Sequence, residues 1–542
     1  MAMIFPSGSS YCFQDKCGIY FWGIHSHDTI WHLALIETAF KRIPFISPTF
    51  SGVALTGYNY LYDLVVFALA KIGISPLFSV FKLIPFFWFI GFTVLLIKLA
   101  KKIKNNPLFI SLFLFFTFFT GSFSYFFTLY RDKTIIGSYG MLSQLPMHLM
   151  LNFQFALSLI GILYILIKTK SKEITLKNII AFGLIVFINL SLKFYGGVVT
   201  LILVGWFLFF KYLLKNIKKL IFYEAIITIF FITSLIIFYN PFASVKSGSI
   251  FTIAPFALVH PITEDPSLFY LQNLTNARYF LLTKGIGPRL IMIEAFNLII
   301  FLFFYLGMRF FGLFYILLKV IKRKITQFDL VVVSTMITAT TITVLIVQKA
   351  EWWNTIQFFY YAVFLSTIYL AELTYELIKK TKFIRYVLVV IIMLLAIPAT
   401  IDITQWSMSF PGDSYLSKDE YEALQILKKQ PEGVVYSPLF EKSLKNLNLY
   451  PFPLYSNGDT AYVTAFSGKQ SYLSDILQLR LTGVDYNQRL EKIQNNDCSL
   501  LKEVDYLYQN NEYKINRKLF NCENRLEMLY GNRTATIYKV IK

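Results

Sequence analysis

Charged residues are scarce in this sequence. Only 15% of its 542 residues are Asp, Glu, Lys or Arg, against about 25% in average soluble chains. Hydrophobic residues make up 56% of the chain, Phe alone occupies 56 positions, and the mean hydropathy is +0.56. This composition excludes an ordinary soluble domain and predicts a polytopic membrane protein.

Acidic residues are fewer than basic ones, 31 against 51, which gives a net charge of +20. Nearly all of the excess lies in five short basic clusters between long apolar runs, where Glu173 is the only acid. Short loops rich in Lys and Arg mark the cytoplasmic side of membrane proteins, so the charge requires no nucleic-acid partner. The clusters are Lys98/Lys101/Lys102/Lys104, Lys168/Lys170/Lys172/Lys177, Lys211/Lys215/Lys218/Lys219, Lys319/Lys322/Arg323/Lys324 and Lys379/Lys380/Lys382/Arg385.

Ten apolar runs are long enough, or nearly so, to cross a bilayer, which takes about 20 residues. With the basic clusters inside, they predict a mostly α membrane helix bundle over residues 76–404, with an outer loop at 241–288. Residues 1–75 and the tail 405–542 then lie on the extracytoplasmic side of a plasma membrane. The runs are near 76–100, 107–129, 147–168, 178–193, 195–213, 219–240, 289–318, 329–347, 355–378 and 384–404.

The segment 57–73 is apolar but short, and it carries Asp63 and Lys71. Counting it as a span would move the basic clusters outside, so it is predicted to lie at the outer membrane surface as an interfacial helix. The first ten residues have no apolar core of the kind found in signal peptides. We therefore expect an upstream transmembrane helix to be missing from the sequence.

The tail 405–542 has nearly balanced charge and a mixed pattern, which predicts a small C-terminal α/β domain. Ser417, followed three residues later by Glu420, forms a capping box for a helix through Lys429. A second helix is predicted at 474–494. Strands are predicted at Val434–Ser437, Tyr462–Phe466, Val504–Tyr508 and Thr534–Val540.

Cysteine is also scarce, with four residues in the chain and none in a predicted span. No two are spaced as C-x-x-C, so a zinc site of that kind is not indicated. In an oxidising compartment an even number favours two local disulfides, Cys12–Cys17 and Cys498–Cys522, with free thiols as the alternative.

Three of the five histidines fall within eight residues, in the segment 25–32. If a helix begins near Asp28, then Asp28 and His32 lie on one face. Three interpretations stay open. Asp28 could be a general base for an acceptor hydroxyl; His25, His27, Asp28 and His32 could bind a divalent cation, Mg²⁺ or Mn²⁺; or Asp28 could cap the helix while the histidines are interfacial.

An outer Asp at the start of an interfacial helix, followed by a Pro-rich link and an aromatic interfacial helix at 58–73, resembles the first outer loop of the GT-C superfamily. These membrane glycosyltransferases use polyprenyl-phosphate-linked sugars and include protein O-mannosyltransferases and aminoarabinose transferases. The remaining layout is also similar, in the second outer loop with Arg131-Asp132-Lys133, in Lys193 at a span edge before Gly196-Gly197, and in the tail segments Phe466–Lys469 and Leu481–Tyr486.

The resemblance implies that Asp28 deprotonates the acceptor hydroxyl and that the sugar is transferred with inversion. The donor would be a polyprenyl-phosphate-linked sugar and the acceptor a glycan, lipid or protein. Asp132 is the next candidate for the base. Candidate contacts to the leaving phosphate or to the sugar are His27, His32, Arg131, Lys133, Lys193, His260, Lys284 and Arg289.

Each of these residues also has a plain structural interpretation, as a loop ion pair, a snorkelling lysine or a turn.

Other classes of protein also stay open. A coupled transporter would carry acids in broken helices at the membrane centre, but the apolar runs here are nearly free of acids. An oligosaccharide polymerase or ligase, or a scaffold for surface-polymer assembly, is the remaining alternative.

Overall fold

The computed structural model describes residues 4–142, 144–170, 174–240, 250–380, 384–513, 515, 517–522 and 525–542. The chain forms two compact units. The first, here called the mixed unit, combines residues 1–87, 236–248 and 407–542; the second, the helical unit, combines 88–235 and 249–406. The basic positions Lys172 and Lys382 lie outside the described residues.

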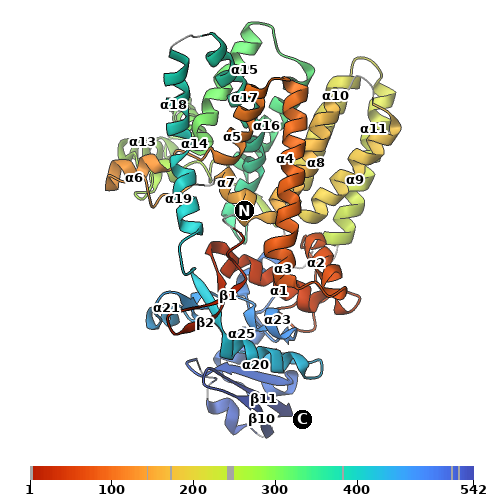
Figure 1. The fold of residues 1–542 in the computed structure, drawn as a ribbon, viewed down its shortest axis with the longest axis vertical. Helices are drawn as coiled ribbons and strands as arrows, with labels where there is room; N and C mark the ends of the chain where they lie inside the picture. Colours follow the sequence, from red (N-terminus) through yellow and green to blue (C-terminus); the bar gives the residue numbers. More distant parts are fainter. Residues whose placement is uncertain are drawn as a thin grey trace. The chain divides into compact units, whose positions relative to one another are not determined.

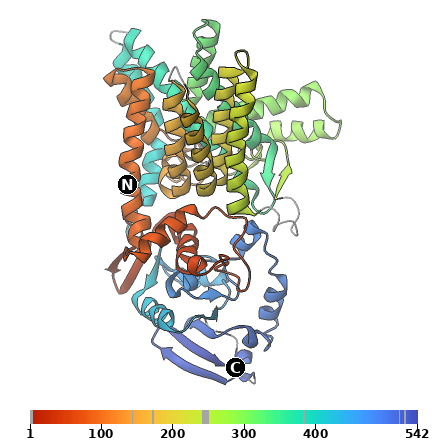
Figure 2. The ribbon, with the colours of Figure 1, turned by 90° about the vertical axis from the view of Figure 1, so that its right-hand side faces the viewer.

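The helical unit is a bundle of apolar helices (Figure 1). Helix α17 is central to it: 83% of its most apolar stretch is buried, and it packs against α5, α10, α15, α16 and α18. Helices α8–α11 pack side by side (Figure 2). The described helices are α4 (Ile84–Ile103), α5 (Pro107–Phe119), α6 (Tyr125–Asp132), α7 (Leu145–Leu151), α8 (Phe153–Thr169), α9 (Leu176–Leu192), α10 (Phe194–Tyr212), α11 (Ile217–Ser234), α12 (Pro261–Glu264), α13 (Gln272–Leu282), α14 (Pro288–Leu306), α15 (Phe310–Ile321), α16 (Gln327–Leu345), α17 (Ile356–Lys380), α18 (Ile384–Ala396) and α19 (Pro398–Ser407).

Six helices among the described residues are long and apolar enough to cross a membrane, or up to eight if each of two bent pairs is one span. The predicted count of about ten spans is therefore not confirmed. The pair α7–α8 bends by 107° at Asn152, and the second bent pair, α18–α19, bends by 40° where Pro398 begins a new helix. The predicted spans at 107–129 and 178–193 contain the shorter helices α5 and α9.

The mixed unit contains two sheets, of which the first combines strands from both ends of the chain and the second only strands of the tail. Antiparallel strands β1 and β2, joined by the Cys12–Cys17 disulfide, extend into the tail in the order β1-β2-β5-β7. The second sheet has the order β10-β11-β9-β6-β8. The strands are β1 (Ser9–Phe13), β2 (Lys16–Phe21), β5 (Ser414–Ser417), β6 (Val434–Tyr436), β7 (Phe452–Pro453), β8 (Gln470–Ser471), β9 (Tyr506–Asn510), β10 (Arg525–Gly531) and β11 (Ala535–Ile541).

Short helices cover these sheets. Helix α1 (Asp28–Thr38) packs on α23 (Tyr462–Ser467), and α23 packs on α20 (Lys418–Lys429). Helix α2 (Leu61–Lys71) has 11 residues, too few to span a bilayer. A second disulfide joins Cys498 to Cys522.

Most secondary-structure elements of the tail agree with those predicted from the sequence. Ser417 caps α20 and accepts a hydrogen bond from the Glu420 amide, and three of the four predicted strands form. The strand predicted at Tyr462–Phe466 is wrong: these residues form α23, because its side chains are buried both against α1 and against α20. The helix predicted at 474–494 is broken at Gly483, which has a positive φ of 72°, into α24 (Ile476–Thr482) and α25 (Asn487–Gln494).

Candidate functional site

The candidate site in the mixed unit begins where α1 begins. A short 3₁₀ turn at Gly23–Ser26 leads into His27, which is non-helical, and Asp28 is the first helical residue. A carboxylate at this position is favoured because it faces the positive end of the helix dipole. The side chain of Asp28 is 59% exposed, and its Oδ1 lies 3.1 Å from Nδ1 of His27.

His27 is charged at neutral pH. Burial lowers its pKa, but the hydrogen bond to Asp28 and the negative charges of Asp475, Asp28 and Asp459 outweigh burial and raise the pKa to about 9. His27 and Asp28 therefore form an ion pair. A protonated imidazole cannot accept a further proton, whereas the exposed carboxylate can.

Two acids of the tail lie close enough to His27 for their charges to raise its pKa. Asp475 is fully buried, adopts a left-handed conformation with φ of 49° and caps α24. Burial raises its pKa to about 7, and the charge of His27 opposes this shift. The Asp459 carboxylate accepts the amides of Asp475 (3.1 Å) and Ile476 (2.8 Å). These bonds fix the Asp459 carboxylate against the start of α24.

The loop that carries Asp459 is also tied to the loop that carries His27. Asn457 donates a hydrogen bond from Nδ2 to Oγ of Ser26 at 3.0 Å. A Cβ built on Gly458 would lie 3.8 Å from Cδ2 of His27, in ordinary van der Waals contact. Gly458 therefore lies directly against the imidazole ring.

The other two histidines of the segment point elsewhere. His25 is buried, contacts Oγ1 of Thr29 through Nδ1 at 2.9 Å, and is neutral because burial lowers its pKa to about 4. His32 contacts Oδ1 of Asp63 through Nδ1 at 2.9 Å. Asp63 is itself fully buried, and burial raises its pKa.

The predicted cation ligands His25, His27, Asp28 and His32 are therefore not brought together. Across the described residues, no group of three or more His, Cys, Asp or Glu side chains is arranged to hold a metal ion. The physical reason is that each histidine already has a different local partner: a threonine one turn away, the first acid of α1, or a buried acid of α2.

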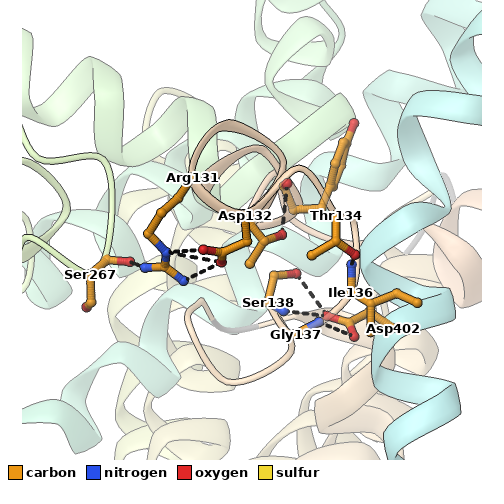
Figure 3. Close-up of polar contacts among 10 residues, drawn as sticks. Arg131, Asp132, Thr134, Ile136, Gly137, Ser138, Ser267 and Asp402 are labelled. Carbon is orange, nitrogen blue, oxygen red and sulfur yellow. Dashed lines mark hydrogen bonds and ion pairs between the residues drawn. The ribbon is translucent and has the colours of Figure 1, made fainter.

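In the helical unit, Arg131 and Asp132 form an ion pair at the end of α6 (Figure 3). Nε of Arg131 lies 2.9 and 3.1 Å from the two oxygens of Asp132, and Nη2 lies 2.8 Å from Oδ2. Nη1 donates to the carbonyl of Ser267 at 3.0 Å. The hydrogen bonds from Arg131 lower the pKa of Asp132, which makes this carboxylate a poorer proton acceptor than an unpaired one.

The loop that follows this pair is anchored by Asp402 of α19 (Figure 3). Its Oδ1 accepts the Gly137 amide at 2.9 Å, and its Oδ2 accepts the amide and hydroxyl of Ser138 at 2.7 and 3.0 Å. Lys133, left-handed with φ of 57°, donates to the carbonyl of Tyr130 at 2.9 Å. This contact directs the Lys133 ammonium to its own helix end.

The remaining candidates lie at helix ends of the helical unit. Lys193 separates α9 from α10 and has an extended backbone conformation. A Cβ on Gly197 would lie 2.3 Å from Cα of Leu190, so the absence of a side chain at Gly197 allows the two helices to pack closely. His260 contacts Glu294 at 2.6 Å, within a network with Arg278. Lys284 and Arg289 are exposed near the start of α14.

Sequence reasoning missed Asp459 and Asp475 as neighbours of His27, and it missed the His32–Asp63 pair. A signal existed for the pair: an acid inside the apolar segment 57–73 needs a partner when it is buried. No signal links Asp475 to His27, because a single sequence does not report contacts between residues so far apart.

No protein-family model matches the sequence, and none of the curated proteins does. Among solved structures, the chain is similar to the archaeal oligosaccharyltransferase AglB from Archaeoglobus fulgidus in complex with an inhibitory peptide and a dolichol-phosphate. The TM-score is 0.48 at 12% identity, over 94% of this chain and 68% of that one. The Archaeoglobus fulgidus oligosaccharyltransferase in complex with Zn and sulfate gives 0.47 and 14%, over 94% and 67%.

A likeness at these TM-scores and identities gives no role to any residue of this chain.

Proposed function

We propose that this protein is a membrane glycosyltransferase that moves a monosaccharide from a polyprenyl-phosphate donor to an acceptor hydroxyl on the outer face of the membrane. The observation that carries the proposal is the exposed Asp28 carboxylate, paired with a charged His27 at the first turn of α1. A general base must be ionised, reachable by its substrate and held in one place. Asp28 combines all three properties.

In the proposed reaction, Asp28 takes the proton of the acceptor hydroxyl as its oxygen attacks the anomeric carbon. The bond between that carbon and the phosphate oxygen breaks, and the polyprenyl phosphate leaves with the electron pair. Attack from the opposite face inverts the configuration, through an oxocarbenium-like transition state. His27 acts as a positioning residue, because its hydrogen bond fixes the carboxylate and its charge balances it.

The leaving phosphate needs positive charge near it. Lys193, Lys284 and Arg289 are the proposed cations of the helical unit, and Arg289 offers the better phosphate fork. Arg131 already engages Asp132 and Ser267. The alternative source of positive charge is a divalent cation, Mg²⁺ or Mn²⁺. Loss of turnover in EDTA, restored by adding one of these ions, would show that the reaction needs a cation.

The test is donor turnover by the purified full chain in lipid nanodiscs. Polyprenyl phosphates carrying different single sugars are offered with glycan, lipid and peptide acceptors, and released polyprenyl phosphate is measured. We expect Asp28→Asn, which keeps the shape and removes the base, to lower turnover by about 100-fold or more. The matched control is Asp485→Asn, at an exposed acid of the tail that is hydrogen-bonded to Asn487.

Equal turnover by the wild type and Asp28→Asn would exclude Asp28 as the base. Release only from donors that carry an oligosaccharide would favour the alternative function, an oligosaccharide ligase or polymerase. Absence of release with every donor would favour a scaffold role in surface-polymer assembly.

A further inference from the structure

A groove of the mixed unit opens between α1, α2 and α20. It consists of two adjoining cavities of about 280 and about 200 Å³, which share Glu37, Ser75, Pro76 and Lys428. At about 30 Å³ per water molecule, the larger cavity alone has room for about nine waters, and the two together are as large as the pockets that bind small ligands. Glu37 lies more than two helical turns beyond Asp28 on α1, so the groove is a site of its own.

Apolar side chains form most of the walls of the groove. Ile36 of α1 and Phe67 and Ala70 of α2 line the larger cavity, and Phe466 of α23 lines the smaller one. Phe67 is held in place by Phe40, which it meets edge-on with ring centroids 5.7 Å apart. Contact with these walls favours a hydrocarbon chain, because both surfaces are removed from water.

The two lysines that line the groove have different partners. Nζ of Lys428 lies 2.7 Å from Oε2 of Glu37, so these two charges neutralise each other. Lys71 is exposed, and its Nζ lies 5.0 Å from the centre of the Phe67 ring. Among the described residues, Lys71 has no carboxylate partner. An anionic ligand in the groove therefore finds its counter-charge at Lys71.

The groove lies at the point where the chain enters a candidate membrane span. Gly73, with φ of 91°, follows the end of α2, and Pro76 begins both helix α3 (Pro76–Phe78) and the 28-residue candidate span Pro76–Ile103. Only 33% of the most apolar stretch of this span is buried, so its remaining surface is available to lipid. Because Pro76 lines both cavities, the position of the groove favours a membrane lipid as its ligand.

We propose that the groove binds one anionic phospholipid, with the phosphate at Lys71 and Ser75 and part of one acyl chain between α1 and α2. The lipid comes from the leaflet on the side of the mixed unit. Its second acyl chain stays in the bilayer, so the bound lipid ties the mixed unit to the membrane surface. This inference goes beyond the proposed reaction and does not depend on it.

The test is photo-crosslinking of the full chain in phosphatidylcholine nanodiscs. A small fraction of the lipid is either phosphatidylglycerol or phosphatidylcholine with a diazirine in one acyl chain, and the labelled peptides are identified by mass spectrometry. The variants are Lys71→Gln, which removes the cation, and Ala70→Trp, which fills the larger cavity. The matched controls are Lys429→Gln, at an exposed lysine of α20, and Ala68→Trp, at an exposed alanine of α2.

We expect phosphatidylglycerol to label residues 67–77 about fivefold more than phosphatidylcholine does, the ratio that one lysine beside an anionic headgroup supplies. Lys71→Gln should remove this difference, and Ala70→Trp should lower the labelling of these residues by both lipids. Both controls should be labelled as the wild type is.

Unchanged labelling of α11, a candidate span of the helical unit, would show that each variant is folded in the membrane. Equal labelling of residues 67–77 by the two lipids, or no labelling there, would overturn the inference. The same labelling in Ala70→Trp as in Ala68→Trp would also overturn it, because the lipid would then lie outside the groove.

Discussion

Nδ1 of His27 and Oδ1 of Asp28 lie 3.1 Å apart although the two residues are sequence neighbours. Consecutive side chains on a helix point apart, but here only Asp28 is helical, while His27 has φ of −124° and ψ of −70°. The pair therefore depends on α1 beginning at Asp28. A helix that began one turn earlier would separate the two side chains.

The pKa of His27 predicts an alkaline limit for stability and for activity. Its folded value, about 9, lies above the ordinary value of 6.5. The stabilisation from its ion pairs is therefore fully present below about pH 6.5 and is lost as the pH rises through about 9. Melting temperature and donor turnover should both fall across that interval in the wild type, and His27→Gln should remove the fall. If melting temperature and turnover of His27→Gln fell over the same pH interval, the group that titrates there would not be His27.

Asp475 predicts a second loss of stability with rising pH, in a lower pH interval than that of His27. Because burial raises its pKa from 3.8 to about 7, the folded chain binds this proton more tightly than the unfolded chain does. Its contribution to stability therefore declines as the pH rises from about 4 to about 7. Asp475→Asn keeps a good helix cap and should melt at a higher temperature than the wild type above pH 7. The two proteins should melt alike near pH 4.

The same substitution should lower the pKa of His27, since it removes one of the negative charges that raise it. NMR of isotope-labelled histidine can follow this titration, because the chain has only five histidines. His27→Gln assigns the signal, and Asp485→Asn serves as the control. An unchanged His27 titration in Asp475→Asn would show that the two side chains do not interact.

Asp132 is expected to be a minor contributor to the reaction. Arg131, whose guanidinium is permanently charged, is hydrogen-bonded to both oxygens of its carboxylate and lowers its pKa. Asp132→Asn should therefore keep donor turnover within about tenfold of the wild type, against the loss of about 100-fold or more expected for Asp28→Asn. An equal loss of activity in Asp132→Asn and Asp28→Asn would contradict the assignment of the base to Asp28.

Asp402 is expected to hold the loop after α6 in place. Asp402→Ala leaves the buried amide and hydroxyl of Ser138 without their acceptor, at a cost of about 1–3 kcal/mol. Limited trypsin digestion should then cut faster after Arg131 and Lys133. Glu422→Ala, which removes an exposed acid from the other unit, should leave the cleavage rate unchanged. Equal cleavage in Asp402→Ala would mean that other contacts hold the loop.

Local patterns predicted the local features of this molecule. Apolar runs indicated the helices of the bundle, Asp28 marked the start of α1, and Ser417 marked the start of α20. The predicted count of about ten spans is not confirmed, because hydropathy does not report where a helix bends or ends. Asn152 and Pro398 interrupt two runs that read as continuous.

The arrangement around His27 could not be predicted in the same way. Asp475 lies 448 residues further along the chain, and its contact depends on the left-handed turn that begins α24. Residues 462–466 alternate like a strand but form α23, because burial on two sides outweighs the strand propensity of Tyr and Val. Both features are consequences of tertiary packing.

The sheet β1-β2-β5-β7 has a consequence for biosynthesis. Strand β2 ends at Phe21 and its partner β5 begins at Ser414, so the ribosome must add almost 400 residues before the hairpin can pair. At about 5–20 residues per second, this delay lasts roughly 20–80 seconds. During that time the edge of β2 is unpaired, and such edges invite aggregation. The nascent chain therefore has a period in which a chaperone that shields β-edges would raise the yield of folded protein.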